Sequence, residues 1–289
     1  MNRRSTSDPV AAVQEIGERQ RPLHMDVGNL IENVGSILTE LYGTVPGSFI
    51  IAGSFAAAVI AWHNYKVNLH YNDVDVFVVR SSQERSNTTE ACGYSIGRDR
   101  SLWIQNVRTM DGVLNGSRVP VNIVELHDTI MTNRGRKESR LSRLVGNFDI
   151  NCVMVGFRVE RDETYEVWKI GEWEIKEPFL KFMATETLAI PNAARCKSII
   201  HSVIRMVKKS CELHLRMELP EPDKLCQIMQ SHTVPDVVVK KWHLLPEAGR
   251  SLPHFKDIEV DGPLEPRYEG QKTEYYRFKK RKSAVVVEK

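Results

Sequence analysis

Two aspartates separated by a single residue constrain the fold of this chain more than any other feature. Asp73 and Asp75 open a run of β-branched and aromatic residues that continues to Val79, a composition typical of a buried strand. Alternate residues of a strand point to the same side, so both carboxylates project together while Val74 faces the core. Two carboxylates on one face repel each other, and a divalent cation is the usual compensation. The pattern predicts a Mg²⁺ or Mn²⁺ site; the alternative is a solvated strand edge or a capped turn.

The residues before this strand provide a second part of the candidate site. Residues 49–52 are apolar and predict a short buried strand, and residues 54–64 predict an alanine-rich helix that leaves it. Gly53 and Ser54 form the turn between these two elements. A helix N-terminus presents backbone N–H groups that have no acceptor within the helix, and such groups suit a phosphate.

This order of parts, a strand, a Gly-Ser turn, a helix and a strand with two acids, resembles the polymerase-β-like nucleotidyltransferase superfamily. The resemblance rests on Gly53, Ser54, Asp73 and Asp75. It implies a small mixed sheet with helices, a helical domain after it, and metal-dependent transfer of a nucleotidyl group from an NTP. It also implies residue roles: Asp73 and Asp75 are catalytic and hold the metal, while Gly53 and Ser54 hold the triphosphate.

The chain departs from the superfamily pattern in two places. The interval between Ser54 and Asp73 is longer than usual, so we expect an extra turn or loop over residues 66–72. The superfamily also has a third carboxylate on a later strand. The corresponding strand here, residues 119–124, carries Asn122 at that position.

Two acids are candidates for the missing carboxylate. Glu125 has an odd offset from Asn122, so we expect it to point to the opposite face. Asp149, in an expected strand, is therefore the predicted third metal ligand and catalytic residue; the alternative is an aspartate that bonds nearby backbone N–H groups. If neither acid fits, the chain is a catalytically degenerate member that binds nucleic acid or acts in assembly, for example in a viral or replication setting.

The distribution of elements predicts an α+β fold, because strands come first and helices follow. We expect a flexible N-terminal arm at residues 1–25, a nucleotidyltransferase-like core at 26–177, a helical domain at 178–248 and a basic, extended tail at 249–289. In the core we expect helices at 27–41 and 127–144, strands at 102–107, 119–126 and 148–159, and a hairpin at Gly171. A long helix is expected over residues 192–219.

Two groups of basic residues are candidate phosphate contacts. Arg205 and Lys208 share one face of the long helix, in the region where helical domains of the superfamily contact the triphosphate. The tail interleaves rings that stack on bases with cations that neutralise phosphates of RNA or DNA; its residues are Tyr276, Arg277, Lys279, Lys280, Arg281 and Lys282. A solvated helix face and a localisation or solubilising tail are the alternatives.

Charge and composition restrict the compartment and the partners. The net charge of +3 is too small to indicate nucleic-acid binding by itself. No apolar run reaches the roughly 18–20 residues of a membrane helix, and the five cysteines form no zinc-binding pattern. We therefore expect an intracellular protein, cytoplasmic or nuclear, without a membrane partner. The resemblance implies an NTP as a partner, and together with the tail it favours RNA or DNA as a further one. The sequence defines neither the acceptor nor the oligomeric state.

Overall fold

The computed structural model describes residues 26–44, 46–80, 94–95, 102–128, 139–191, 199–231, 233–255, 258–266 and 268–280. These residues belong to two compact units, Met1–Thr185 and Glu186–Lys289. The predicted N-terminal arm over residues 1–25 lies outside the described residues.

The boundary between the units falls after helix α5 (Glu177–Thr185), not before it. Phe179 and Phe182 of α5 are buried, and the helix packs against η4 (Asn151–Val153), a short 3₁₀ helix of the first unit. Because α5 buries its apolar side against the first unit, the predicted boundary at residue 177 is too early.

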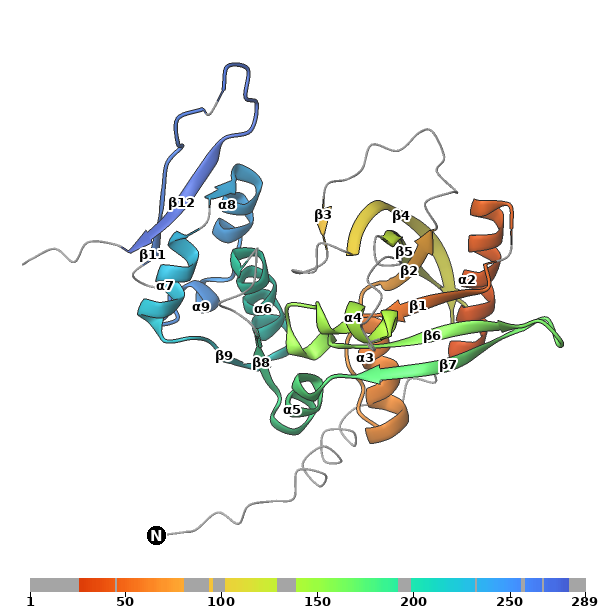
Figure 1. Cartoon of the computed structure of the whole chain (residues 1–289). Coiled ribbons are helices and arrows are strands. Elements are labelled where there is room, and N and C mark those ends of the chain that lie inside the picture. Colours follow the sequence, from red (N-terminus) through yellow and green to blue (C-terminus); the bar gives the residue numbers. More distant parts are fainter. Residues whose placement is uncertain are drawn as a thin grey trace, which may run out of the picture. The chain divides into compact units, whose positions relative to one another are not determined.

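A seven-stranded mixed sheet forms the first unit. Its strands follow the order β3 (Tyr94–Ser95), β4 (Leu102–Leu114), β5 (Ser117–Asp128), β2 (Val74–Arg80), β1 (Ser48–Ala52), β6 (Val155–Asp162) and β7 (Val167–Ile175). The pair β2–β5 is parallel, and every other neighbouring pair is antiparallel. The mixed sheet and its helices confirm the predicted α+β class for this unit (Figure 1).

Helix α2 (Val27–Tyr42) lies against β4 and β7 of this sheet (Figure 1). Asp26 accepts a hydrogen bond from the backbone N–H of Asn29 at the start of this helix, and Gly43 ends it in the left-handed conformation, so the helix expected over 27–41 is confirmed. Trp168 of β7 packs edge-on against Phe49 and so close to Gly35 of α2 that no Cβ has room there. The tight contact fixes α2 on this face of the sheet.

Helix α3 (Ser54–Ile60) contacts β1, β2 and β6, and its residues from Phe55 onward are buried. The strand before Gly53 and the strand after Asp73 therefore share one sheet with the intervening helix packed on it, which agrees with the mixed sheet that the resemblance implies. The helix continues as one π-helical turn, η1 (Ala61–Tyr65), which ends at Lys66 in the left-handed conformation. This turn and the irregular residues 66–72 accommodate the long interval before Asp73.

Three expected elements of the core differ in the structure. Strand β5 continues to Asp128, and helix α4 (Arg140–Gly146) covers only the end of the helix expected over 127–144. Asn147, Asp149 and Asn151 favour turns, so the expected strand over 148–159 is shortened to β6, with a bend at Asp149 and η4 before it. The segment between β5 and α4, residues 129–138, lies outside the described residues.

The hairpin is also shifted along the chain. Its turn lies at residues 163–166, where Asp162 accepts hydrogen bonds from the backbone N–H groups of Thr164 and Tyr165. Gly171, predicted as the turn, lies within β7 at a bulge opposite β6. A glycine inside a strand marks a bulge as readily as a turn, and the Asp162 side chain decides the position of the turn.

The second unit combines helices with two small sheets in the part of the chain that is described. Its elements are β8 (Thr187–Ala189), α6 (Ile199–Leu213), β9 (Arg216–Glu218), α7 (Pro222–Gln230), β10 (Thr233–Pro235), α8 (Asp236–His243), α9 (Glu247–Arg250), β11 (Ile258–Asp261) and β12 (Tyr275–Lys280). Strands β8 and β9 pair in parallel, and β10–β12–β11 form an antiparallel sheet. The expected long helix corresponds to α6; residues 192–198 lie outside the described residues.

The predicted extended tail contains a structural strand. β12 is the central strand of its sheet, and Phe278 is buried with its ring 5.2 Å from that of Trp242. Phe255 packs against the same Trp242 ring. Residues 275–280 of the tail are extended, but they form an ordered strand, because the aromatic residue Phe278 among the basic residues completes a small core.

Truncating Phe278 is expected to destabilise the second unit. Phe278→Ala should lower the free energy of unfolding by about 3–5 kcal/mol, because it leaves a cavity beside Trp242. Arg277→Ala, at the exposed neighbouring position, is the matched control and should change stability little. Thermal unfolding followed by circular dichroism measures both; equal melting temperatures would contradict a core role for Phe278.

No helix in the described part of the chain is long and apolar enough to cross a membrane. Cys152, Cys211 and Cys226 are thiols rather than halves of a disulfide. The intracellular location stays a prediction.

Candidate metal and nucleotide site

Three polar side chains meet at the beginning of β2. The Asn122 amide nitrogen Nδ2 donates to Asp73 Oδ2 at 2.9 Å and to Asp75 Oδ1 at 3.0 Å. All three side chains are partly exposed. One nitrogen atom therefore lies between two carboxylates, which confirms that Asp73 and Asp75 point to the same side of the chain.

The parallel pairing of β2 with β5 brings Asn122 to this position. In its register Asp75 lies beside Asn122, and Val74 and Val76 lie beside Val121 and Ile123. These four apolar side chains are fully buried. The alternation of the strands thus commits one face to the core and leaves the polar residues together on the other.

Thr109 of β4 extends the polar cluster by one residue. Its hydroxyl group donates to Asn122 Oδ1 at 2.9 Å, and the two residues are paired in the β4–β5 ladder. Thr109 was not among the residues predicted from the sequence. The Asn115-Gly116 turn could have revealed it, because both residues have positive φ and a two-residue turn fixes the register of the two strands.

Gly53 lies directly against the carboxylates. A Cβ built at this residue would be 3.2 Å from Asp75 Oδ2, and the backbone has φ +92°, a conformation that other residues rarely adopt. Its backbone N–H donates to the carbonyl of Val155 in β6, which holds the turn at the end of β1. Ser54 is the first residue of α3 and is partly exposed. The predicted turn and the predicted acids therefore lie together.

Tyr71 connects the irregular segment before β2 to helix α3. Its ring packs edge-on against Phe55, with the centroids 5.1 Å apart. Burial raises the pKa of the Tyr71 hydroxyl group above its ordinary value. The contact anchors the chain two residues before Asp73 and so helps to position that carboxylate.

Glu125 points away from the cluster, as its odd offset from Asn122 predicts. Its buried carboxylate accepts a hydrogen bond from the Tyr42 hydroxyl group of α2 at 3.0 Å, and Arg108 lies 3.9 Å away. Glu125 therefore belongs to the face that packs against α2 and takes no part in the candidate site.

The prediction that Asp149 completes a three-carboxylate site is not supported. Asp149 lies in a bend before η4, and no group of three or more His, Cys, Asp or Glu side chains within the described ranges is arranged to hold a metal. The turn-forming residues around Asp149 prevent the strand that would have carried it into the site. Asn122, a neutral amide, lies beside Asp73 and Asp75 where the superfamily pattern has its third carboxylate.

The predicted basic contacts are all in the second unit. Arg205 and Lys208 are exposed on α6, and Lys208 lies 3.7 Å from Glu212. Their role toward a triphosphate stays a prediction.

In β12, two predicted nucleic-acid contacts have acidic neighbours. Lys279 Nζ donates to Asp261 at 3.0 Å, and Lys280 Nζ donates to Asp223 at 2.6 Å. Tyr276 donates to Glu274 at 2.7 Å, and Arg277 is exposed. Arg281 and Lys282 lie outside the described residues. Carboxylates beside the lysines weaken the case that this strand is a phosphate-binding surface.

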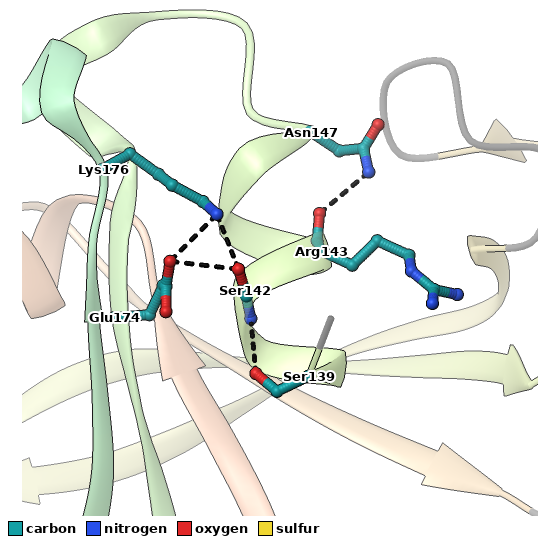
Figure 2. A network of polar contacts seen from close by, with 6 residues as sticks. All are labelled: Ser139, Ser142, Arg143, Asn147, Glu174 and Lys176. Carbon is teal, nitrogen blue, oxygen red and sulfur yellow. Dashed lines mark hydrogen bonds and ion pairs between the residues drawn. The ribbon is translucent and has the colours of Figure 1, made fainter. Parts of the chain in front are cut away.

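A second polar network joins α4 to β7 (Figure 2). Lys176 Nζ donates to Ser142 Oγ at 2.6 Å and pairs with Glu174 Oε1 at 2.9 Å, while Ser142 Oγ donates to the same carboxylate. The network therefore attaches the first turn of α4, capped by Ser139, to the sheet.

The cluster at Asp73 and Asp75 fits a hard divalent cation. Two carboxylates already converge on one atom, the Asn122 Nδ2, and the same amide carries an oxygen, Oδ1, that accepts a hydrogen bond from Thr109. Carboxylate and amide oxygens are the ligands that Mg²⁺ and Mn²⁺ prefer, whereas zinc selects histidine and cysteine. Asp73 and Asp75 would hold the cation, and Asn122 is adjacent to both.

No protein-family model matches the sequence, and no curated protein matches it. Solved structures of CCA-adding enzymes and tRNA nucleotidyltransferases, which belong to the polymerase-β-like superfamily, are distantly similar to this chain. A CCA-adding enzyme in complex with CTP has a TM-score of 0.39 and 11% identity, and the alignment covers 73% of this chain and 47% of the enzyme.

Two further solved structures are similar to this chain at a comparable TM-score and sequence identity. The Thermotoga maritima CCA-adding enzyme complexed with tRNA has a TM-score of 0.35 and 10% identity, covering 73% of this chain and 47% of the enzyme. A tRNA nucleotidyltransferase with a primer tRNA and an ATP analog has a TM-score of 0.35 and 11% identity, covering 68% and 49%. This chain spans about half the length of these enzymes. Similarity at this level carries no argument about function.

Proposed function

We propose that this protein transfers a nucleotidyl group from an NTP to a hydroxyl acceptor, with a divalent cation held by Asp73 and Asp75. The observation that carries the proposal is the convergence of these two carboxylates on one atom, beside the Gly53 turn and the start of α3. Nucleotidyl transfer needs such an arrangement, because charge must be balanced at both the attacking and the leaving oxygen.

Each part of the site has a separate task in this proposal. A bound Mg²⁺ or Mn²⁺ would lower the pKa of the attacking hydroxyl group and neutralise the leaving pyrophosphate. Asp73 and Asp75 supply the negative charge that retains the cation. Gly53 lets the chain pass close to Asp75 without a side chain, and the backbone at Ser54, the first residue of α3, would bind phosphate oxygens of the NTP.

RNA or DNA is the acceptor class that we propose, and Arg205 and Lys208 are the proposed contacts to the triphosphate. Both are exposed cations on α6, and cations of this kind bind phosphate as a bidentate fork or as a point charge. The remaining candidate contact to nucleic acid in the described part of β12 is the exposed Arg277.

The proposal is tested by incubating the protein with each α-³²P-labelled NTP, Mg²⁺ or Mn²⁺, and a mixture of RNA, DNA and protein acceptors. We expect label to enter an acceptor and pyrophosphate to be released in equal amount. Mutating Asp73 and Asp75 together to asparagine should abolish both signals. Acceptor labelling that persists in this double variant would contradict the assignment of the site.

A second function is favoured by the Asn122 amide. Its two hydrogen bonds satisfy the carboxylates without a cation, as expected of a degenerate core that keeps the fold for binding or assembly. Under this alternative the wild-type protein transfers no nucleotidyl group to any acceptor. Asn122→Asp would then restore tight Mn²⁺ binding and weak transfer, because it recreates the third carboxylate of the superfamily.

A further inference from the structure

Asn122 makes contacts that a carboxylate at the same position could not make. An amide carries two N–H donors and one acceptor oxygen, whereas an ionised carboxylate only accepts. Both donors of Asn122 are used, one on Asp73 and one on Asp75. With its nitrogen in this position, the amide lies between the two negative charges and reduces their repulsion.

The same side chain can present an oxygen instead. Rotation of the amide by half a turn about the Cβ–Cγ bond exchanges Oδ1 and Nδ2 with little displacement of other atoms. After this rotation the amide oxygen faces the two carboxylates, which repel it unless a cation lies among the three groups. The direction of the amide is therefore coupled to the presence of a cation.

Thr109 makes both directions of the amide acceptable. Its hydroxyl group now donates to Asn122 Oδ1 at 2.9 Å, and a hydroxyl group can equally accept a hydrogen bond from an N–H donor. Because Thr109 is exposed on β4, its hydroxyl hydrogen is free to reorient. In both orientations of the amide, the atom that faces away from the carboxylates has the Thr109 hydroxyl group as its hydrogen-bond partner.

We propose that Asn122 is an amide switch: it stands in for the cation in the cation-free protein and rotates to become the third ligand when the cation binds, with Thr109 as its positioning residue. This inference rests on the proposed function, because it assigns the metal-binding mode of the same site. In this binding mode Asn122, a neutral ligand, takes the place of the third carboxylate of the superfamily.

The switch has a consequence for stability and affinity. Two carboxylates and an amide carry one negative charge fewer than three carboxylates. Without a cation, the repulsion within this site is therefore weaker than in a three-carboxylate site, and the site binds a cation more weakly. The protein should accordingly be fully folded without Mn²⁺. Asn122→Asp should make its melting temperature depend strongly on Mn²⁺, because only the bound form relieves the repulsion.

The test measures Mn²⁺ binding by calorimetry and electron paramagnetic resonance, without any nucleotide, in folded variants. Asn122→Ala, which removes both the stand-in and the ligand, should bind Mn²⁺ about tenfold more weakly than wild type, and Asn122→Asp should bind it more tightly. Thr109→Val, which cannot hydrogen-bond, should weaken binding less, and Thr109→Ser should restore it. In ¹⁵N spectra, Mg²⁺ should shift the Asn122 side-chain amide signals.

Each outcome separates this inference from the proposed function. If Asn122→Ala binds Mn²⁺ as tightly as wild type or more tightly, while Asp75→Asn binds none, the site is real but Asn122 is no ligand, and the switch is refuted alone. If the Asn122 amide signals do not move at saturating Mg²⁺, the switch is refuted as well. If Asp75→Asn binds Mn²⁺ like wild type, the proposed function and the switch fail together.

Discussion

Replacing Asp75 by asparagine should reduce nucleotidyl transfer on the order of 10³-fold, the largest effect that we expect from a single substitution at the site. The new side chain has nearly the same shape, but it removes one of the two charges that retain the cation. Cation stabilisation of the transition state contributes several kcal/mol, and each 1.36 kcal/mol corresponds to about tenfold in rate. The measurement is the single-turnover rate at saturating NTP, together with the Mn²⁺-dependent rise in melting temperature, which should disappear.

Asp111→Asn is the matched control for this substitution. Asp111 lies on β4 of the same sheet, and its exposed carboxylate pairs at the surface with Arg118, 3.4 Å away. The change in charge is identical, and surface pairs of this kind contribute little. Transfer and the Mn²⁺ response should stay at the wild-type level. A comparable loss in both variants would show that net charge, not a specific site, controls the activity.

Gly156→Val should unfold the first unit or lower its melting temperature by roughly 10 °C, the largest stability effect that we expect in that unit. Gly156 of β6 lies where β1 and α4 meet. A Cβ there would be 2.8 Å from the Ala52 Cβ, 3.0 Å from the Ile51 carbonyl oxygen and 3.1 Å from Val145. Because backbone and side-chain atoms surround the position, the new side chain must separate β1 from β6 and displace the Gly53 turn.

Gly47→Val is the control, because a Cβ at that residue meets nothing within 4 Å. Differential scanning calorimetry of both variants measures the effect. A melting temperature of Gly156→Val within about 2 °C of the control would contradict the close packing of β1, β6 and α4, since interiors at native density do not accept an added side chain without cost.

The part of the site that could be predicted from the sequence is the part encoded by neighbouring residues. The alternation around Asp73 and Asp75, the apolar strand before Gly53 and the helix after it are short-range patterns, and the structure contains all three. The direction of Glu125 followed from the same alternation. Local geometry was sufficient here because strand and helix periods are set by the backbone itself.

The rest depends on contacts between distant segments. The apolar run after Asp149 predicts a strand that carries this residue into the site, but turn-forming neighbours place it in a bend. Phe278 lies among cations in the sequence, and its burial depends on Trp242, a residue of another element. Such pairings leave no periodic signal in the sequence around either residue, so a single sequence cannot reveal them.

Thr109 is an intermediate case. Its pairing with Asn122 is fixed by the Asn115-Gly116 turn, which is visible in the sequence. Asp111-Gly112 is also a turn-forming pair in the sequence and obscures this register, whereas β4 runs through both residues to Leu114. A single turn at Asn115-Gly116, with one continuous strand on each side, is sufficient to pair the Thr109 hydroxyl group with the Asn122 amide.

The central claim is that Asp73 and Asp75 hold a divalent cation for an NTP, and anomalous diffraction tests it most directly. Crystals grown with Mn²⁺ and a non-hydrolysable NTP analogue are measured near the manganese absorption edge. We predict an anomalous peak bonded to carboxylate oxygens of both aspartates, with the triphosphate beside Gly53 and Ser54. Bound nucleotide with no manganese peak at these two residues, or a peak held by other side chains, would contradict the claim.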